Sequence, residues 1–355
     1  MKVKPSEEYG FSNQTIDWRN AIDKKVSGRL CLPSLCDSSN KPLILMCDSE
    51  TSPQNKFFVK VKCDNKEVHF EDTNAMNPES IFYQIRLIPI VKLRNLLPYR
   101  ISYAIEGIDQ LLDMESGGES DLSSIKLGET HISLTLCDYL ERDWHCYRKI
   151  PSHGDDNDIH LWEFESSSHE RALTLDLAVK LSVENSSLIV SLFAPFWMIN
   201  RTAQQLVYKI DEKTVLYHAP TVMTPVLLSF KPNSFFCKKK LSLSVGDSRF
   251  SDGFSIDVVG SKGNVIAKSK NGKYFYYVSV DIQLSRIGLS KIVTITPFYS
   301  IINVSKKSIE ISEDNDEWFS VETMSTKAFW PKQSKDQNIY FRFDSESLSS
   351  KVSQN

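Results

Sequence analysis

The fold of this chain is decided by the stretch Leu192-Phe-Ala-Pro-Phe-Trp-Met-Ile-Asn200-Arg-Thr-Ala-Gln-Gln-Leu-Val-Tyr208. Its pattern is an apolar run into Pro195, an aromatic pair, an aliphatic residue and then Asn200. Leu206 and Tyr208 follow and share one face if they lie on a strand, because successive side chains of a strand point to opposite faces. The stretch therefore predicts a strand, a short bend and a second strand.

The same pattern occurs twice more in the chain. The upstream copy is Leu87-Ile-Pro-Ile-Val-Lys-Leu-Arg-Asn95, followed by Ile101 and Tyr103, and the downstream copy is Ile295-Thr-Pro-Phe-Tyr-Ser-Ile-Ile-Asn303, followed by Ile309 and Ile311. The three asparagines lie 200 − 95 = 105 and 303 − 200 = 103 positions apart. A fixed period of this length indicates a repeat protein with units of about 100 residues.

Between these copies, apolar and polar residues alternate, which is typical of half-buried strands. Every odd position of 173–183 is aliphatic, and 276–284 shows a similar pattern one repeat later. Short strands separated by frequent turns favour sandwiches. The sequence predicts an all-β fold of tandem antiparallel β-sandwich repeats, stacked in an elongated or hooked array. We expect each unit to end on a long hairpin whose second strand begins the next unit.

Four parts follow from this period. We expect residues 1–80 to form the back half of a preceding repeat, 81–187 and 188–289 to form full β-sandwich repeats, and 290–355 to form the truncated front half of a following repeat. The polar segment 116–124 is expected to be an inserted loop. Gly260 and Gly263 are expected to form a tight hairpin turn between strands at 253–259 and 264–267. A chain that begins and ends within a repeat is expected to be a piece of a larger protein.

Composition excludes several classes of protein. Hydrophobic residues make up 41% and aromatic residues 11%, which is ample for a packed core. The net charge of −3 gives no global field for nucleic acid. No apolar run approaches the roughly 20 residues of a membrane span, and no secretory leader follows Met1. The seven cysteines do not follow the repeat, so reduced thiols in a cytosolic protein are expected.

Motifs for catalysis and for cofactors are missing from the sequence. It holds no Gly-x-Ser-x-Gly elbow and no phosphate-binding loop. The one cluster that resembles a metal site has no pair of ligands preset on one element, so a polar surface loop is favoured. Its members are His145, Cys146, His153, Asp155, Asp156, Asp158 and His160. We therefore predict no enzyme activity, no metal and no cofactor.

Two groups of residues are candidates for binding. Asn95, Asn200 and Asn303 each follow an apolar strand, where an Asn side chain can hold a turn by bonding nearby backbone. The alternative is that these amides bind the backbone of an extended peptide. The second group, Lys238-Lys239-Lys240, is either a solvated loop or a contact for lipid headgroups and other anions.

Aromatic residues mark the repeats, and burial in the core is expected for most of them. The residues in question are Phe196, Trp197, Phe298, Tyr299, Trp318 and Trp330.

Several motifs in register resemble a known family. They are Pro195-Phe-Trp-Met-Ile-Asn-Arg-Thr202, Phe254-Ser-Ile-Asp-Val-Val-Gly-Ser261, Val293-Thr-Ile-Thr-Pro-Phe-Tyr299 and Phe329-Trp-Pro331. The chain resembles the vacuolar protein sorting-associated protein thirteen family of bridge-like lipid transfer proteins. The region of resemblance is the adaptor-binding (VAB) domain, which overlaps the SHORT-ROOT-binding (SHR-BD) domain. The match is strongest over 190–331 and weaker over 81–189.

The resemblance implies six β-sandwich repeats stacked into a hook, each with a signature Asn at the position of Asn95, Asn200 or Asn303. It also implies binding to Pro-x-Pro motifs of membrane-bound adaptors. Such binding recruits a lipid-conducting rod from the cytoplasm to organelle membranes and contact sites, for lipid transport and vacuolar protein sorting. Lipid is carried by other regions of such proteins, and the adaptor groove lies toward their carboxyl-terminal repeats.

The leading hypothesis is thus a non-enzymatic recruitment module that binds adaptor peptides. One alternative is a purely structural spacer. The other is a β module that attaches directly to membrane lipid through residues 231–240.

Overall fold

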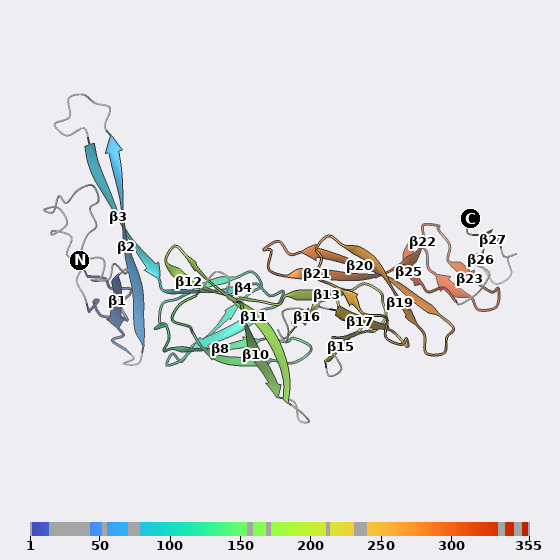
Figure 1. The fold of residues 1–355 in the computed structure, drawn as a ribbon, viewed down its shortest axis with the longest axis horizontal. Helices are drawn as coiled ribbons and strands as arrows, with labels where there is room; N and C mark the ends of the chain where they lie inside the picture. The colour runs from blue at the N-terminus through green and yellow to red at the C-terminus, as the bar shows by residue number, and fades with distance from the viewer. Residues whose placement is uncertain are drawn as a thin grey trace. The chain divides into compact units, whose positions relative to one another are not determined.

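The computed structural model describes residues 2–13, 43–51, 55–69, 79–154, 159–167, 172–210, 214–230, 240–332, 338–343 and 350–353. Within these ranges the chain forms strands and turns and no helix, which confirms the all-β prediction (Figure 1). In the same ranges, no helix is long and apolar enough to cross a membrane. Two compact units divide the chain, Met1–Phe193 and Ala194–Asn355.

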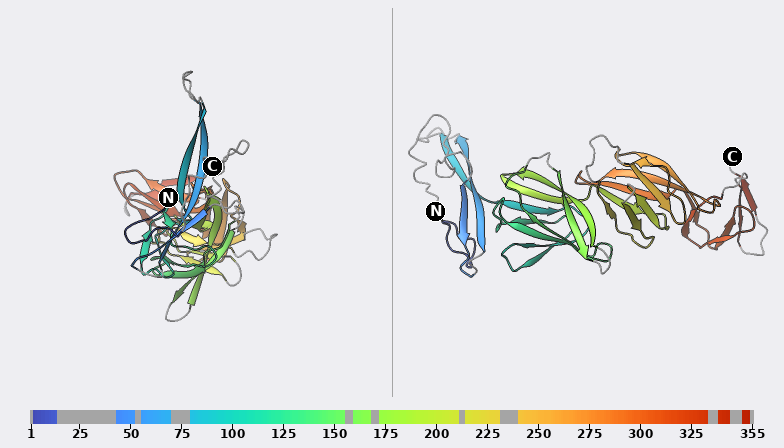
Figure 2. Two further views of the ribbon diagram at one scale, coloured as in Figure 1. Left: turned by 90° about the vertical axis from the view of Figure 1, so that its left-hand side faces the viewer. Right: turned by 60° about the horizontal axis from the view of Figure 1, so that its bottom comes forward.

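The first unit opens with a three-stranded sheet in the order β1-β2-β3. These strands are β1 (Leu43–Asp48), β2 (Lys56–His69) and β3 (Glu79–Pro89). All pairs are antiparallel. The long hairpin of β2 and β3 extends well beyond the other strands of its unit (Figures 1 and 2). Leu45, Val59 and Val61 form the small buried core of this sheet.

A nine-stranded sheet follows in the first unit, in the order β6-β5-β8-β9-β10-β11-β12-β4-β7. Its strands are β4 (Val91–Asn95), β5 (Ile101–Ile105), β6 (Leu111–Met114), β7 (Glu119–Leu122), β8 (His131–Leu136), β9 (Trp144–Lys149), β10 (Ile159–Ser167), β11 (Ala172–Glu184) and β12 (Ser187–Phe193). The segment expected as a loop at 116–124 was thus predicted wrongly, because it contains β7. This short strand pairs along β4.

The hairpin of β11 and β12 shows how the sequence builds this sheet. Asn185 and Ser186 have φ of 49° and 72°, the left-handed geometry of a two-residue hairpin loop. The strand that leaves the turn is buried at every position and pairs in parallel with β4, Leu188 opposite Val91 and Leu192 opposite Asn95. The last strand of this sheet in the sequence, β12, therefore pairs with the first, β4.

The second unit begins with a five-stranded sheet, β16-β13-β21-β20-β19, and a four-stranded sheet, β15-β14-β17-β18. The strands are β13 (Phe196–Asn200), β14 (Leu206–Lys209), β15 (Val215–His218), β16 (Val226–Leu228), β17 (Lys240–Val245), β18 (Phe254–Ser255), β19 (Lys262–Lys268), β20 (Phe275–Leu284) and β21 (Lys291–Pro297). Here β21 pairs in parallel with β13, as β12 does with β4.

The predicted hairpin at Gly260 and Gly263 is wrong. The strand before it is only β18, which pairs with β17, whereas β19 pairs with β20. Gly260 therefore lies where the chain crosses from one sheet to the other, and Gly263 lies within β19, opposite Val280. Val258 and Val259, expected in the first strand of the hairpin, are 63% and 43% exposed.

Two further sheets complete the second unit. They are the pair β22-β25 and the four-stranded sheet β24-β23-β26-β27. Their strands are β22 (Tyr299–Asn303), β23 (Ile309–Ser312), β24 (Phe319–Val321), β25 (Ser325–Phe329), β26 (Asn338–Arg342) and β27 (Ser350–Ser353).

Strand pairings recur with an offset of nine in the strand number. The pair β4 and β7 corresponds to β13 with β16 and to β22 with β25. Likewise β10-β11-β12 corresponds to β19-β20-β21 and to β1-β2-β3. The division into parts at 80/81, 187/188 and 289/290 stays a prediction, and β12 lies in the first compact unit.

Candidate functional site

The three asparagines of the sequence motif are buried at the ends of β4, β13 and β22, with exposed fractions of 0%, 5% and 2%. Asn95 donates from Nδ2 to the carbonyl of Tyr99 at 2.8 Å, and its Oδ1 accepts the N–H of Leu97 at 3.1 Å. Its Nδ2 also lies 3.2 and 3.1 Å from the carbonyls of Met114 and Glu115. One side chain thus joins the turn after β4 to the connection between β6 and β7.

Asn200 repeats this arrangement. Its Nδ2 donates to the carbonyl of Gln204 at 2.8 Å, and its Oδ1 accepts both the N–H and the hydroxyl of Thr202, at 3.0 and 2.7 Å. The amide again reaches the carbonyl four residues ahead, and the oxygen holds the N–H two residues ahead. The motif predicted from sequence is therefore one hydrogen-bonded turn made three times.

Asn303 completes the set. Nδ2 donates to the carbonyls of Lys307 and Val321 at 2.8 and 2.9 Å, and Oδ1 accepts the N–H and hydroxyl of Ser305 at 2.9 and 2.7 Å. Because buried polar groups need partners and these amides have theirs inside the fold, the geometry favours the repeat-fixing interpretation over direct contact with a peptide.

The lysine cluster falls largely outside the described residues, which exclude Lys238 and Lys239. Lys240 is the first residue of β17, is exposed and lies opposite Ser255 of β18. Its predicted contact with lipid or another anion stays a prediction.

The candidate metal cluster does not form a ligand set in the described part of the chain, where no group of three or more His, Cys, Asp or Glu side chains could hold an ion. His145 Nδ1 lies 3.0 Å from Thr135 Oγ1, and His153 Nδ1 lies 2.8 Å from Ser152 Oγ. Burial raises the pKa of the Cys146 thiol to about 11, which disfavours the thiolate that a metal would require. Asp155, Asp156 and Asp158 lie outside the described ranges.

Three cysteines have side chains in the described ranges, and none of the three is in a disulfide. They are Cys47, Cys137 and Cys146.

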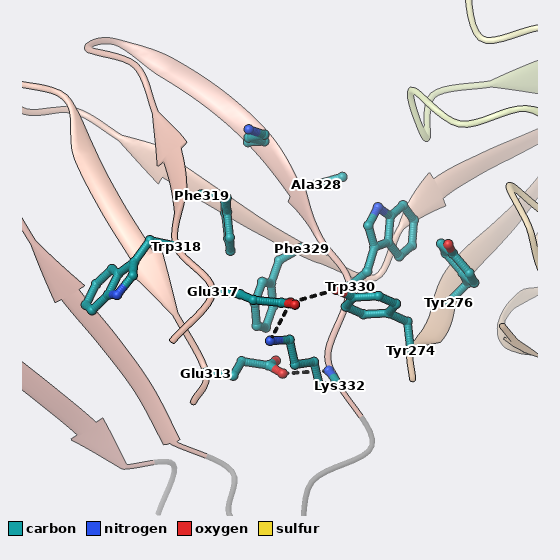
Figure 3. Close-up of a pocket in the computed structure, with 11 residues that line it drawn as sticks. Tyr274, Tyr276, Glu313, Glu317, Trp318, Phe319, Ala328, Phe329, Trp330 and Lys332 are labelled. Carbon is teal, nitrogen blue, oxygen red and sulfur yellow. Dashed lines mark hydrogen bonds and ion pairs between the residues drawn. The ribbon is translucent and has the colours of Figure 1, made fainter. Parts of the chain in front are cut away.

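A cavity of about 380 Å³ lies in the second unit, between the start of β20 and the elements β23 to β25 (Figure 3). Most of its lining is aromatic. The lining residues are Tyr274, Tyr276, Glu313, Glu317, Trp318, Phe319, Lys327, Ala328, Phe329, Trp330 and Lys332. The bridge between Tyr274 and Lys332 and the bond from Phe275 N–H to the Pro331 carbonyl, at 3.0 Å, hold the two sides together.

Ion pairs form the polar side of this cavity. Lys332 Nζ bonds Asp314 and lies 2.8 Å from Glu317 Oε2, while Lys273 also pairs with Glu317. The hydrogen bonds from Lys273 and Lys332 lower the pKa of Glu317 to about 2. Burial raises the pKa of Glu313, which accepts the Lys332 N–H at 2.6 Å. The carboxylates and amines are therefore bonded mainly to one another.

The rings leave an apolar surface beside this ion cluster. Trp330 and Tyr276 have ring centroids 5.3 Å apart, and Phe319 stacks on Phe329 at 6.1 Å. The Tyr276 hydroxyl donates to Asp247 at 2.6 Å. Aromatic walls with a few polar groups are the lining expected of a site for apolar side chains or proline rings.

The sequence predicted that most aromatic residues are buried in the core. It did not predict that several of them line one cavity. Phe196 is indeed in the core at 1% exposed, but Phe298 is 43% exposed, and Trp318 and Trp330 line the cavity. The only signal in the sequence was the density of aromatics at 274–277 and 318–330, which does not by itself say that the two segments meet.

Comparison with known proteins now gives the family. The family model for the vacuolar-sorting associated protein 13, adaptor binding domain, matches residues 1–355. The mouse intermembrane lipid transfer protein VPS13A is 33% identical over 288 residues, which are 81% of this chain and 9% of that protein. The mouse protein VPS13C is 33% identical over 335 residues, 92% of this chain and 8% of that protein.

A more distant relative is intermembrane lipid transfer protein VPS13 of Chaetomium thermophilum, 20% identical over 342 residues, or 88% of this chain and 10% of that protein. The chain therefore spans a tenth or less of the length of these relatives. With a family model that covers every residue and relatives at 33% identity, this chain belongs to the family of vacuolar-sorting associated protein 13 adaptor binding domains.

Proposed function

We propose that this chain binds proline-containing segments of adaptor proteins, and that it does so without catalysis. The family match supports adaptor proteins as partners, and the relatives named as intermembrane lipid transfer proteins support lipid transport as the activity that such binding serves. On this proposal the chain acts from the cytoplasmic side, at the surface of organelle membranes and at contact sites, and other regions of the protein carry lipid.

The aromatic cavity is the observation that carries the proposal. Pro-x-Pro segments are pre-extended and lose little entropy on binding, and such segments dock in grooves lined by aromatic rings. Trp330 with Tyr276, and Phe319 with Phe329, are two pairs of rings in the lining of this cavity. The proposed peptide-binding residues are therefore these four rings and Trp318, which also lines the cavity. Asn303 holds the turn after β22.

Titration with a fluorescently labelled Pro-x-Pro peptide tests this proposal. Trp318→Ala removes one cavity wall, and Tyr217→Ala removes a ring of which 64% is exposed, outside the cavity lining. We expect saturable binding to the unaltered chain and to Tyr217→Ala, and binding at least about tenfold weaker to Trp318→Ala, because a lost aromatic anchor costs 1.4 kcal/mol or more. A peptide with both prolines changed to alanine is the matched ligand control.

If Trp318→Ala and Tyr217→Ala bind the peptide equally well, the cavity is not the adaptor site, and the site lies elsewhere on the chain. If a well-folded chain binds neither peptide, the purely structural spacer is the better hypothesis. Flotation with anionic liposomes tests direct attachment to lipid, which is excluded if the protein stays at the bottom of the gradient.

A further inference from the structure

A second cavity, of about 360 Å³, lies within the first unit. We call it the first-unit cavity. Its walls are the start of β2 with the segment 5–9, and β5, β6 and β7 with the residues beside them. By twice the offset of nine strands, β2 corresponds to β20, and β5 to β7 correspond to β23 to β25. Those elements line the aromatic cavity, so the two cavities occupy the same place in the repeat.

The register of β2 and β20 extends the correspondence to single residues. Leu87 and Ile295, each eight residues before a motif asparagine, pair with Val61 and Val280. Residues near the start of β2 therefore correspond to residues 280 − 61 = 219 positions later, near the start of β20. Two positions of each lining are related in this way, Asn55 with Tyr274 and Phe57 with Tyr276.

The opposite wall is related in the same way. Val91 and Tyr299, each four residues before a motif asparagine, pair with β7 and β25 at Leu122 and Phe329. The related lining positions on this wall are Asp121 with Ala328, Leu122 with Phe329, Ser123 with Trp330 and, between β6 and β24, Leu112 with Phe319. A cavity at this place is therefore a feature of the repeat that the chain builds twice.

Backbone hydrogen bonds hold the walls of the first-unit cavity together. Phe58 N–H donates to the Ser123 carbonyl at 2.6 Å, much as Phe275 N–H donates to the Pro331 carbonyl at the aromatic cavity. The segment 5–9 is fixed as well, because Glu50 N–H bonds its Glu8 carbonyl at 2.8 Å. The first-unit cavity is thus already formed without a ligand, which reduces the entropy lost on binding.

Rings provide the apolar part of the first-unit cavity. Tyr9 and Phe57 lie edge to face with their centroids 5.7 Å apart. Tyr103 also lines the cavity, and its hydroxyl lies 2.6 Å from Ser120 Oγ. Rings held in this way present a fixed apolar surface to a proline ring or an aliphatic side chain.

The charge of the lining distinguishes the two cavities. The aromatic cavity has Lys327 and Lys332 beside its carboxylates. Among the described residues, the lining of the first-unit cavity contains Glu8 and Asp121 and no lysine or arginine. Asp121 pairs with Lys92 at 3.3 Å, whereas Glu8 is exposed and its carboxylate has no partner in the described ranges. The first-unit cavity therefore favours a ligand that brings a positive charge to Glu8.

We propose that the first-unit cavity is a second peptide site, which takes an extended segment with a proline or aliphatic residue against Tyr9 and Phe57 and a lysine or arginine beside Glu8. This inference rests on the proposed function of the aromatic cavity, because the correspondence of the two linings is what points to a peptide. One chain thus holds two segments of its partners at once, and the first unit selects the basic one.

Calorimetric titration counts the sites. The ligand is a Pro-x-Pro peptide with lysine on either side, and the matched ligand has glutamine in both places. We expect two equivalents of the lysine peptide to bind the unaltered chain. Tyr9→Ala and Trp318→Ala should each keep one site and weaken the other at least about tenfold, because each loses an aromatic anchor of one cavity.

A charge reversal tests the role of Glu8 with the aromatic cavity disabled by Trp318→Ala. Glu8→Lys in this background should weaken the lysine peptide at least about fivefold, because an attraction becomes a repulsion. Glu7→Lys changes an exposed residue of the same segment outside the lining, and it should change the affinity less than about twofold. The glutamine peptide should bind both charge variants equally well.

The outcomes separate the two proposals. Binding of one equivalent that Trp318→Ala abolishes would overturn this inference and leave the aromatic cavity as a peptide site. A site lost in Tyr9→Ala and kept in Trp318→Ala would support this inference and exclude the aromatic cavity. If Tyr9→Ala does not fold, hydrogen exchange on the unaltered chain decides. Excess lysine peptide should slow exchange of the amides at 108–112, and unchanged exchange there would exclude the site.

Discussion

At the scale of single residues, the three buried asparagines are the most informative feature. We expect Asn95→Ala to destabilise the first unit by about 2–4 kcal/mol, because it leaves the buried N–H of Leu97 and the buried carbonyl of Met114 without their partner. Two part-buried carbonyls also lose a bond, and each unsatisfied buried group costs roughly 1–3 kcal/mol. Urea unfolding of the variant measures the loss. Asn264→Ala, at an exposed position of β19, is the control and should change stability by less than about 0.5 kcal/mol.

Asn95→Asp sharpens the same test. It has nearly the same shape but places a carboxylate oxygen where Nδ2 now faces the carbonyls of Tyr99, Met114 and Glu115. We expect it to be at least as destabilising as Asn95→Ala at neutral pH. An Asp variant as stable as the unaltered chain would show that these bonds do not hold the turn.

The ion cluster at the cavity makes a prediction about pH. Lys332 lowers the pKa of Asp314 and, together with Lys273, that of Glu317 to about 2 from an ordinary value of 4.5. Because the folded state binds these protons less readily than the unfolded chain, the stabilisation is complete above pH 4.5 and is lost as pH falls toward 2.

Unfolding by urea at a series of pH values checks this dependence. The stability difference between the unaltered chain and Lys332→Met should shrink as pH falls through this window. Lys306→Met, at an exposed position, should give a difference that does not depend on pH. A constant difference for Lys332→Met would mean that the pairs contribute nothing through the charge of the carboxylates.

At the scale of strands, β12 and β3 occupy corresponding places but differ in burial. Leu192 is 0% exposed beside β4, and Leu87 of β3 is 48% exposed. We expect Leu192→Ala to cost about 2–5 kcal/mol as a large-to-small change in a core, and Leu87→Ala to cost less than about 1 kcal/mol. The midpoints of urea unfolding of the two variants make the comparison, which equal losses would contradict.

Strands also show how far the sequence could predict the fold. The alternation at 173–183 predicted β11, and the turn at 184–187 predicted the hairpin, because both signals are local. The strand β7 was missed because Glu119-Ser-Asp-Leu122 has one apolar residue and is held by pairing with β4 rather than by its own pattern. The cavity was missed because residues 274–276 meet residues 313–332 only through tertiary pairing.

At the scale of the whole chain, we expect the two compact units to unfold independently, each with its own stability. Leu192 belongs to the unit Met1–Phe193 and Met198 to the unit Ala194–Asn355, and both are 0% exposed. We expect Leu192→Ala to lower the temperature of one calorimetric transition and Met198→Ala that of another, because domains with their own cores unfold with their own stability. A single transition that both substitutions shift equally would show that the units unfold together.

The parallel pairing of β12 with β4 has a consequence for synthesis. Val91 and Leu188 are neighbours in the sheet but lie 188 − 91 = 97 residues apart in the chain. At roughly 5–20 residues per second, a ribosome delivers β12 some 5–20 s after β4. During that interval β4 is open to the wrong parallel strand. Chaperone demand during translation should therefore peak once per repeat, just before each closing strand emerges.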